Sequence, residues 1–538
     1  MKLIYRLGQK KKEASFDNDD LSFVSEEKEE QHIIKVIAKK DIVLLNAIIE
    51  EPYEFKDGDQ AFLNGYSAWT ATKTVDNKYK EMNIYKKFTK LLYKFIPADT
   101  YGDYFFHKYK RNCIHGYDVF FVKGNNPLYI LSNNYKNAYL IIELDKKKKL
   151  VRLTSDVEHT HLKAGKEFTI FDYVKFGSFE KGEAYFNKKH PLLNKEKILG
   201  YTSWYNYYQN INEEIILRDL DALDSRFQLF QIDDGYETYV GDWLDVDPKK
   251  FPNGLEPIVK KIHEKGLKAG LWLAPFVAET ESKLFKTRPE LFKKDKHGKP
   301  LRTGVGWSGQ YSLDIEKEEA VKYIKTCLKH YLDMGFDFFK LDFLYAINNG
   351  KNSYSRASIS EKGYQLLRDI LGDKLILGCG AIPSSSIHHF DYIRVGMDLT
   401  LDYEGGFYDK IKPCYEYPST RNTLQNTIYR SFMGQRLFGN DPDVFLLRDD
   451  NTSLSLEQRR SVTTINALFG DLLMCSDNIA TYNEEQKKIL ENCLDIFRNA
   501  TNKKYVLDND IIHIQYELKG QKHYFDFNVK EGLLFTKE

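Results

Sequence analysis

The heptapeptide DFFKLDF, residues 337–343, is the best starting point for predicting how the chain folds. An apolar run ends here in Lys340 and Asp342, which share one face of an extended strand because side chains alternate at every second residue. Barrels of alternating strands and helices form their active sites at the carboxyl ends of the parallel strands. The stretch therefore predicts one strand of such a barrel, with two functional side chains at its end.

Runs of similar character lie on either side of this stretch and complete a set of predicted strands. In chain order, the set comprises residues 198–204, 228–234, 268–276, 337–343, 375–380, 391–398, 443–447 and 471–477. Helices are predicted between them at residues 212–223, 255–265, 317–334 and 360–371, with Asn212 and Ser360 as N-caps. This alternation predicts a (β/α)8 TIM barrel. A doubly wound open sheet is the structural alternative, but its glycine-rich phosphate-binding fingerprint is absent.

The regions before and after the barrel have the pattern of β structure. Short alternating runs such as IIKVIAKK and AYLIIELD, separated by turn signals, predict an N-terminal β-sandwich. A helix over residues 484–499 leads into further alternating runs, which predict a small C-terminal antiparallel β domain. We therefore expect the sandwich at residues 1–190, the catalytic barrel at 191–490 and the β-sheet domain at 491–538.

Composition excludes several classes of partner. The chain has 79 Lys+Arg against 78 Asp+Glu, so its net charge of +1 creates no global field for nucleic acid or an anionic membrane. No stretch approaches the roughly eighteen apolar residues of a membrane span, and the first residues lack the apolar core of a secretory signal. The six cysteines are scattered without metal-ligand spacing. These features favour a cytoplasmic enzyme and leave its oligomeric state open.

Two aspartates at the ends of the fourth and sixth predicted strands, Asp342 and Asp398, are candidates for catalysis. On a barrel rim they would face each other across a central cavity. Glycoside hydrolysis needs such a pair, because one carboxylate attacks the anomeric carbon while the other protonates the leaving oxygen. Lys340 would lower the pKa of Asp342, and Arg394 would hold Asp398 or bind a sugar hydroxyl. The competing explanations are rim salt bridges and simple capping of the helices that follow.

Adjacent acids, Asp233 and Asp234, end the second predicted strand. Such a pair can bind a metal, but no histidine or third carboxylate lies at ligand spacing nearby. Two acceptors side by side suit two neighbouring sugar hydroxyls, such as those at the 4- and 6-positions of galactose. Trp204 and Trp272 lie at strand ends and can stack on the apolar face of a pyranose, although ordinary packing also explains them.

In their order along the chain, these motifs resemble glycoside hydrolase family 36, the compact bacterial and archaeal α-galactosidases of clan D. The segments that carry the resemblance are GYTSWYNYY (200–208), FQIDDGYE (230–237), GDWL with FPNGL (241–255), GLWLAPF (270–276), FFKLDFLYA (338–346), LILGCG (375–380), IRVGMD (393–398), NDPDVFLLR (440–448) and NGYSAW (64–69). The family's GWNSW-like and GWQSW-like loops read GYTSW and GYSAW here. Packing beside each retained tryptophan can therefore differ from the family's.

The resemblance implies the family's fold of sandwich, barrel and β domain, and a role for each matching residue. Asp342 would be the nucleophile and Asp398 the acid/base of a retaining, double-displacement α-galactosidase that needs no cofactor. The sugar subsite would comprise Asp233, Asp234, Lys340, Cys379, Arg394, Trp204, Tyr205, Trp272 and, from the first domain, Trp69. The implied substrates are small terminal α-galactosides such as melibiose or raffinose.

Three alternatives stay open at this point. Gly378 and Gly380 flank Cys379, where the 2-position of the sugar is expected, and would leave space for the acetamido group of an α-N-acetylgalactosaminide. An α-galactosyl transferase of the raffinose-synthase type would use the same carboxylate pair. A sugar-binding protein on an inactive barrel would lack one of the two carboxylates, and both are present.

Overall fold

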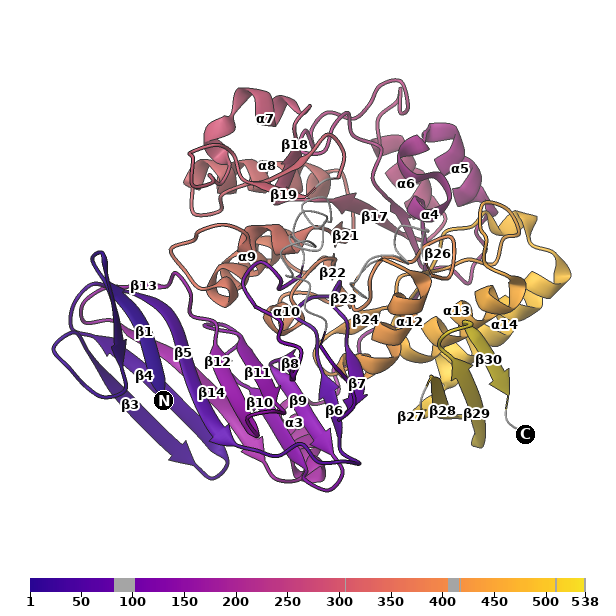
Figure 1. Ribbon diagram of the computed structural model, residues 1–538. Coiled ribbons are helices and arrows are strands. Elements are labelled where there is room, and N and C mark those ends of the chain that lie inside the picture. The colour runs from indigo at the N-terminus through magenta and orange to yellow at the C-terminus, as the bar shows by residue number, and fades with distance from the viewer. Residues whose placement is uncertain (82–101, 305, 405–415, 417, 509, 537–538) are drawn as a thin grey trace. The chain divides into compact units, whose positions relative to one another are not determined.

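Figure 1 shows the computed structural model, which describes every residue except 82–101, 305, 405–415, 417, 509 and 537–538. The chain divides into two units. The first comprises Met1–Pro191, Ile347–Leu366 and Ile382–Ser385; the second comprises Leu192–Ala346, Leu367–Ala381 and Ser386–Glu538. The three domain boundaries expected from the sequence stay a proposal.

The first unit contains two antiparallel sheets around a shared apolar core. One sheet has the order β2 (Lys10–Ala14), β1 (Lys2–Leu7), β5 (Ile42–Pro52), β12 (Leu150–Ser155), β11 (Leu140–Asp145) and β8 (Cys113–Tyr117), with β13 (His161–Leu162) beside β5. The other has the order β3 (Leu21–Lys28), β4 (Gln31–Ala38), β14 (Glu167–Phe176), β10 (Leu128–Ser132), β9 (Val119–Lys123), β6 (Gln60–Leu63) and β7 (Lys73–Asp76). Every second residue of β12 is buried, as expected of a strand with one face on a core that both sheets supply. The predicted N-terminal β-sandwich is confirmed.

The second unit contains a sheet in which all strands run parallel. Its strands in chain order are β15 (Ile198–Thr202), β16 (Leu229–Ile232), β17 (Lys268–Leu273), β21 (Phe338–Leu341), β22 (Leu375–Gly378), β23 (Tyr392–Arg394), β24 (Gly439–Asp441), β25 (Val444–Phe445) and β26 (Leu472–Cys475). Every residue of β15, β16 and β21 is buried, which explains the nearly continuous apolar runs in the sequence.

The parallel sheet closes on itself through a divided strand. Its order is β24-β23-β22-β21-β17-β16-β15-β26-β25, so the two edge strands are β24 and β25, which only Pro442 and Asp443 separate in the chain. Proline has no N–H and interrupts the ladder. The two pieces therefore serve as one seventh strand, paired with β23 on one side and β26 on the other. The predicted TIM barrel is confirmed, although the predicted strand at 443–447 covers only the second piece.

Most helices of the barrel begin and end close to their predicted positions. They are α5 (Glu213–Ala222), α6 (Glu256–Glu264), α8 (Glu318–Asp333) and α14 (Glu484–Asn499). Asn212 caps α5 as predicted, because its side chain accepts the N–H of Ile215. The helices α12 (Thr420–Tyr429) and α13 (Leu456–Phe469) were not predicted, since their many buried polar residues obscure the amphipathic pattern.

The prediction that Ser360 caps a helix is wrong. The helix α9 (Arg356–Leu371) begins one turn earlier. Ser355 takes the capping role, because its Oγ accepts the N–H of Ser358 at 3.1 Å. Ser360 instead donates its hydroxyl to Asn348 Oδ1 at 2.8 Å from within the helix.

A small antiparallel sheet ends the second unit. Its strands, in spatial and chain order, are β27 (Thr501–Asp508), β28 (Ile511–Leu518), β29 (Gln521–Asn528) and β30 (Leu533–Thr536). In β28, Ile512, Ile514 and Tyr516 are buried while their neighbours are not, so one face of the sheet packs on the unit. The predicted C-terminal β domain is confirmed.

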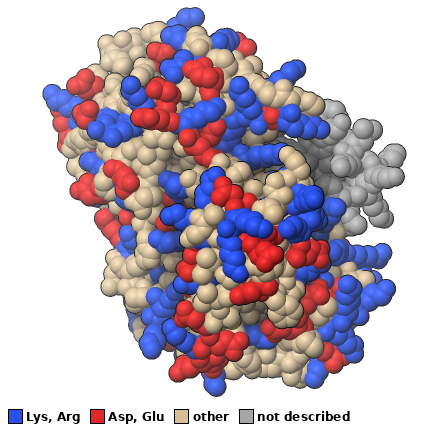
Figure 2. Space-filling model, turned by 90° about the vertical axis from the view of Figure 1, so that its left-hand side faces the viewer, with Lys and Arg blue, Asp and Glu red and all other residues tan. Residues whose placement is uncertain are grey.

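The charges on the face shown in Figure 2 are mixed in sign, and the described cysteines form no disulfides. Figure 2 shows Lys and Arg interspersed with Asp and Glu over the face in view, in keeping with the near-balanced composition. Within the described parts of the chain, no helix combines the length and apolarity needed to cross a bilayer. Cys113, Cys327, Cys379, Cys475 and Cys493 are buried and free, and Cys414 lies outside the described residues.

Candidate active site

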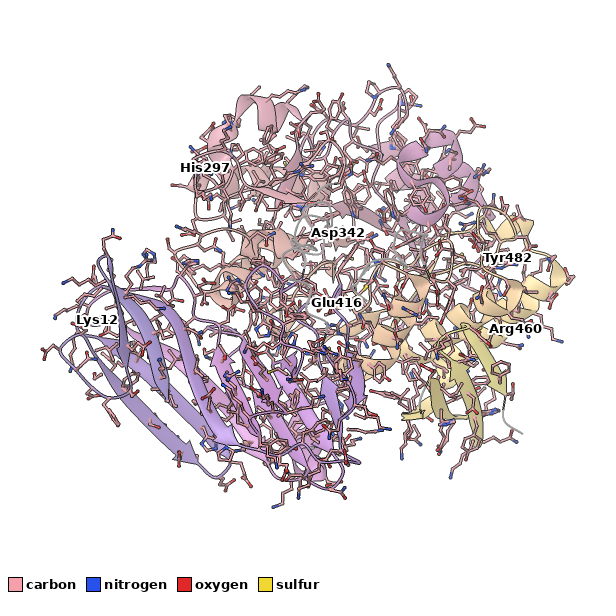
Figure 3. All side chains as sticks on the ribbon, in the orientation of Figure 1. Lys12, His297, Asp342, Glu416, Arg460 and Tyr482 are labelled. Atoms are coloured by element: carbon pink, nitrogen blue, oxygen red, sulfur yellow. The ribbon has the colours of Figure 1, made fainter. Side chains whose placement is uncertain are left out.

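The carboxyl ends of the barrel strands bring together most of the residues predicted to form a site. Acids follow β16 and β21, a lysine lies in β21, an arginine ends β23, and a further acid follows it. Figure 3 labels Asp342 among the side chains of this unit. The predicted residues within the second unit are Trp204, Tyr205, Asp233, Asp234, Trp272, Lys340, Asp342, Cys379, Arg394 and Asp398.

Asp342 is half-buried at the end of β21 and is held by N–H donors. Its own N–H donates to the carbonyl of Leu273 in β17 at 2.8 Å, which extends the ladder by one residue. Its carboxylate accepts Trp272 Nε1–H at 3.2 Å and the backbone N–H of Phe343 at 2.7 Å. Phe343 has a φ of 54°, a strained value for a bulky residue that is typical of functional sites. These donors orient both carboxylate oxygens.

Lys340 forms a buried ion pair with Asp233. Its Nζ lies 2.8 Å from Asp233 Oδ2, and only 6% and 2% of the two side chains are exposed. The same oxygen accepts hydrogen bonds from Thr202 Oγ1 at 3.0 Å and Gln231 Nε2 at 2.9 Å. Burial opposes both charges, but their mutual attraction outweighs it: the pKa of Asp233 is lowered and that of Lys340 is raised. Asp342 adds to the raising of the Lys340 pKa, as expected if these groups share one site.

Among the described residues, Asp234 has no cationic partner and is held by neutral donors. Gln209 Nε2 lies 3.1 and 3.2 Å from its two oxygens, and Trp307 Nε1 donates to Oδ2 at 2.9 Å. Trp307 has a φ of 50°, and its ring lies 6.2 Å from that of Trp272 and 4.9 Å from that of Phe343. Burial raises the pKa of Asp234. The sequence reasoning missed Gln209 and Trp307, which lie in loops; the scarcity of tryptophan was the only signal for Trp307.

Arg394 is buried among three aspartates. Its guanidinium lies 2.7 Å from Asp441, 2.8 Å from Asp443 and 3.1 Å from Asp398. Asp441 and Asp443 are fully buried, and Asp443 also accepts the N–H of Leu399 at 2.8 Å. The sequence predicted the contact between Arg394 and Asp398. It missed Asp441 and Asp443, which β24 and the break after it bring beside Arg394.

Asp398 lies in the setting of a general acid. Its surroundings exclude much of the solvent and raise its pKa to about 7, although Arg394 opposes the shift and the charges of Asp443 and Asp342 add to it. Even so, 38% of its side chain is exposed, so a bound molecule can reach it. The mutual influence of Asp398 and Asp342 indicates that both carboxylates face one site.

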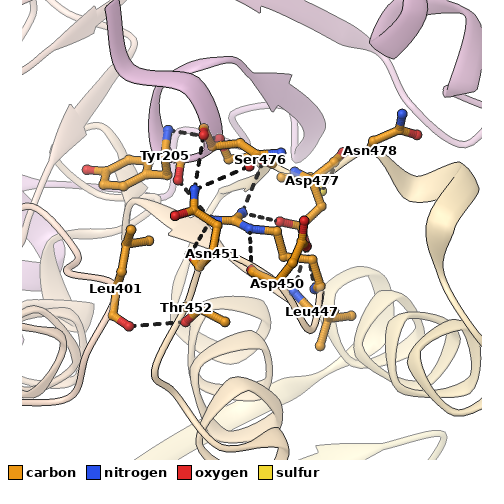
Figure 4. A network of polar contacts seen from close by, with 12 residues as sticks. Tyr205, Leu401, Leu447, Asp450, Asn451, Thr452, Ser476, Asp477 and Asn478 are labelled. Carbon is orange, nitrogen blue, oxygen red and sulfur yellow. Dashed lines mark hydrogen bonds and ion pairs between the residues drawn. The ribbon is translucent and has the colours of Figure 1, made fainter. Parts of the chain in front are cut away.

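Figure 4 shows the polar network that fixes Tyr205. Its N–H donates to Ser476 Oγ at 3.0 Å, and its carbonyl accepts from Arg448 Nη2 at 2.8 Å. Arg448 is held in turn by Asp477, whose carboxylate lies 2.5 Å from Nη1. The Tyr205 hydroxyl donates to Asp443. Tyr205 is therefore a rigid link between the first strand end and the arginine cluster.

The remaining predicted residues differ in what the structure says of them. Trp204 is half-buried, with its ring 5.1 Å from that of Tyr208. Cys379 is buried, and burial raises the pKa of its thiol, so the neutral thiol is the form present at neutral pH. Trp69 belongs to the first unit, and its predicted contact with the sugar stays a prediction.

The site offers hydrogen-bond acceptors and donors and no metal-ligand set. Asp233 is already occupied by Lys340, and Asp234 by two N–H groups. Over the described parts of the chain, no group of three or more His, Cys, Asp or Glu side chains has the arrangement that a metal ion requires. The metal alternative for the paired acids finds no support in this geometry.

Known sequences match the first half of the barrel. Residues 178–373 match the family model named Melibiase. The chain is 28% identical over 194 residues to α-galactosidase 1 of Pediococcus pentosaceus, which is 33% of this chain and 26% of that protein. It is 30% identical over 187 residues to the A type blood α-D-galactosamine galactosaminidase of Flavonifractor plautii, which is 32% of this chain and 17% of that protein. The matches thus span about a quarter or less of these curated relatives.

Solved structures match over nearly the whole chain. TtGalA, an α-galactosidase from Thermus thermophilus in complex with p-nitrophenyl α-D-galactopyranoside, has a TM-score of 0.70 at 24% identity, covering 93% of this chain and 98% of that one. The family 36 α-galactosidase AgaA of Geobacillus stearothermophilus has a TM-score of 0.61 at 14% identity, covering 94% and 72%. Both confirm the fold. With the Melibiase match, they confirm the resemblance to glycoside hydrolase family 36 noted in the sequence.

Proposed function

We propose that the chain is a retaining α-galactosidase that releases terminal α-linked galactose from oligosaccharides. The observation that carries the proposal is the contrast between two carboxylates in one site. Asp342 accepts two N–H donors, whereas Asp398 has a pKa of about 7. A retaining glycosidase needs this contrast, because its nucleophile must be ionised while its acid holds a proton.

The proposed reaction has two steps. In the first, Asp342 attacks the anomeric carbon while Asp398 gives its proton to the departing glycosidic oxygen, which leaves a glycosyl ester on Asp342. In the second, Asp398 takes a proton from water, and the water oxygen attacks the same carbon and releases Asp342. Two inversions give net retention. Arg394 would hold the Asp398 carboxylate between its two protonation states.

The paired acids are the proposed receptors for galactose. Asp233 and Asp234 lie next to each other, and each keeps lone pairs beyond the donors described above. Two such acceptors suit the neighbouring 4- and 6-hydroxyls of galactose. A solved relative, TtGalA, is described in complex with stachyose, at 25% identity and a TM-score of 0.68 over 92% of this chain and 99% of that one. We infer small α-galactosides of the melibiose and raffinose type as substrates, handled in the cytoplasm.

A second candidate is an α-N-acetylgalactosaminidase. The galactosaminidase of Flavonifractor plautii, to which the chain is similar, is the reason to consider it. The geometry around Cys379 weakens this candidate. A side-chain carbon added at Gly378 would lie 2.6 Å from the Phe390 ring, and one added at Gly380 would lie 2.9 Å from the Tyr345 ring. Rings already occupy the space that a side chain at either glycine would take, so the two glycines open no free volume at their own positions.

The test is a hydrolysis screen over p-nitrophenyl α-glycosides with NMR of the first-formed sugar. We expect turnover of the α-galactoside, at least tenfold slower turnover of its N-acetyl analogue, and α-galactose as the first product. Appearance of β-galactose first would refute retention, and preference for the N-acetyl substrate would refute the galactose assignment. A transferase would give oligosaccharides in place of free galactose at high acceptor concentration.

A further inference from the structure

The turn after the paired acids folds one more carboxylate back onto the site. Gly235 has a φ of 116°, and a side-chain carbon there would lie 2.7 Å from the Gln209 backbone, so only glycine fits this turn. The turn brings Glu237 under Asp234, with the Gly235 N–H donating to Glu237 Oε2 at 3.3 Å. Glu237 is 5% exposed and pairs with Val246 through a backbone bridge. Its side chain is thus enclosed and held in place.

The contact between Glu237 and Asp234 requires a proton. The Glu237 side chain lies within hydrogen-bonding reach of that of Asp234, yet no N–H or O–H group of the described chain donates to the buried Glu237 Oε1. Two ionised carboxylates are acceptors only and cannot bond to each other. One of the two acids must therefore carry the hydrogen that joins them.

The surrounding donors show which acid carries it. Asp234 accepts N–H groups from Gln209 and Trp307 on its two oxygens, as an ionised carboxylate does. Glu237 has weaker donors: within the described chain, its hydrogen bond is the long one from the Gly235 N–H, at 3.3 Å. Lys250 donates to the carbonyls of Gln209 and Gly235, and no salt bridge within the described residues reaches either acid. The proton therefore belongs on Glu237.

We propose that Glu237 is a neutral carboxylic acid whose O–H donates to Asp234 and holds that carboxylate in the orientation that receives the substrate. It is a positioning residue, and the proposal rests on the role of Asp234 given above. Burial first, and then the charge of Asp234, raise the pKa of Glu237 well above its ordinary value. The other titratable groups that face it, Tyr236 and Tyr331, have pKa values that burial raises, so they add no charge.

Kinetics with p-nitrophenyl α-galactopyranoside test the positioning role. Glu237→Gln keeps a donor towards Asp234 and should leave KM within about threefold, whereas Glu237→Leu should raise KM about tenfold or more with a smaller change in kcat. In the wild type, KM should rise at alkaline pH as Glu237 loses its proton, and in Glu237→Gln this rise should be absent. A Glu237→Gln variant as impaired as Glu237→Leu would overturn the proposal.

Thermal unfolding tests the proton itself without reference to activity. A buried neutral acid makes the folded state bind more protons than the unfolded state above the ordinary carboxyl pKa, so stability falls as pH rises through that range. Between about pH 5 and pH 9 the Tm of the wild type should therefore fall more steeply than that of Glu237→Gln. Equal slopes would show that Glu237 carries no proton, whatever the substrate of the enzyme is.

Glu279 provides a matched control for the amide substitution. It is also buried, but its carboxylate accepts the N–H of Val240 at 2.9 Å and both the N–H and the hydroxyl of Ser308, at 3.1 and 2.7 Å. Glu279→Gln should lower Tm at every pH, because an amide cannot accept all three donors. If Glu237→Gln lowers Tm in the same pH-independent way, Glu237 is ionised and the proposal is wrong. If the wild type fails to hydrolyse every α-glycoside tried, the proposed function fails while the Tm comparison still decides the proton.

Discussion

The ends of β21 and β23 present the same side chain, an aspartate, in opposite surroundings. Asp342 accepts N–H groups from Trp272 and Phe343 and lies opposite the Lys340 charge. Asp398 forms an ion pair with Arg394, and two fully buried aspartates share that cation. The first setting fixes the orientation of both carboxylate oxygens, and the second raises the pKa of Asp398 and so favours the carboxylic acid. Two chemical roles can thus be set by what the adjoining strands deliver, without any difference between the two residues themselves.

The largest effect should come from the β21 end. Asp342→Asn removes the nucleophile, so we expect kcat/KM on p-nitrophenyl α-galactopyranoside to fall by roughly 10⁴-fold or more. The Tm should change little, because the side chain is half-buried and forms no ion pair within the part of the chain that the structure describes. Turnover near that of the wild type would remove Asp342 from the mechanism.

The β23 end should respond according to the leaving group. Asp398→Ala should lower kcat/KM by about 10²- to 10⁴-fold on raffinose, whose leaving oxygen needs a proton, and by much less on p-nitrophenyl α-galactopyranoside. The ratio of the two losses is the measurement. Equal losses on both substrates would show that Asp398 does not act as the acid.

The cluster around Arg394 should set the pH range of that acid. The wild type should lose kcat/KM as the pH rises through about 7, where Asp398 loses its proton. Asp443→Asn removes a negative charge that offsets Arg394, so the Asp398 pKa should fall and this limb should move down by about one pH unit. Asp391→Asn is the control, since Asp391 pairs with Lys195 and Arg368 just before β23 begins. It should cost stability and leave the limb in place; a shift in both variants would contradict the assignment.

The smallest effects should separate the two tryptophans. Trp307→Phe removes the N–H that Asp234 accepts and should raise KM by about three- to tenfold with kcat nearly unchanged. Trp272→Phe removes the N–H that Asp342 accepts and should lower kcat by a similar factor. Steady-state kinetics of both variants check this. Changes in the same parameter would mean that the two rings serve one purpose.

The sequence alone was sufficient for the barrel and for the residues at its strand ends. Runs such as 338–341 are buried on both faces, so they are mostly apolar and easy to recognise in a sequence. An acid that directly follows such a run must lie at the end of the strand. It was insufficient where a contact depends on a loop or a break in a strand. Trp307 and Gln209 reach Asp234 from loops whose paths no periodicity encodes.

Asp441 and Asp443 show a second kind of limit. The piece GND at Gly439–Asp441 is too short and polar to be recognised as a strand, yet it lies fully buried beside β23. Glu237 shows a third kind of limit. It stands in the recognised motif, but its protonation state follows only from which donors surround it, and those come from other segments. Ser360 was misassigned because an earlier serine, Ser355, competes for the same cap.

The break at Pro442 ties the assembly of the barrel to its chemistry. The barrel is closed by the two pieces on either side of this proline, since β24 pairs with β23 and β25 pairs with β26. The same pairing places Asp443, between the two pieces, where it forms an ion pair with Arg394 and accepts the hydroxyl of Tyr205. Asp342 and Asp398 lie outside this divided strand, whereas Asp441 and Asp443, two of the three aspartates around Arg394, come from it and from its break. The segment that closes the barrel therefore also sets the charges around Arg394, and through it the surroundings of Asp398.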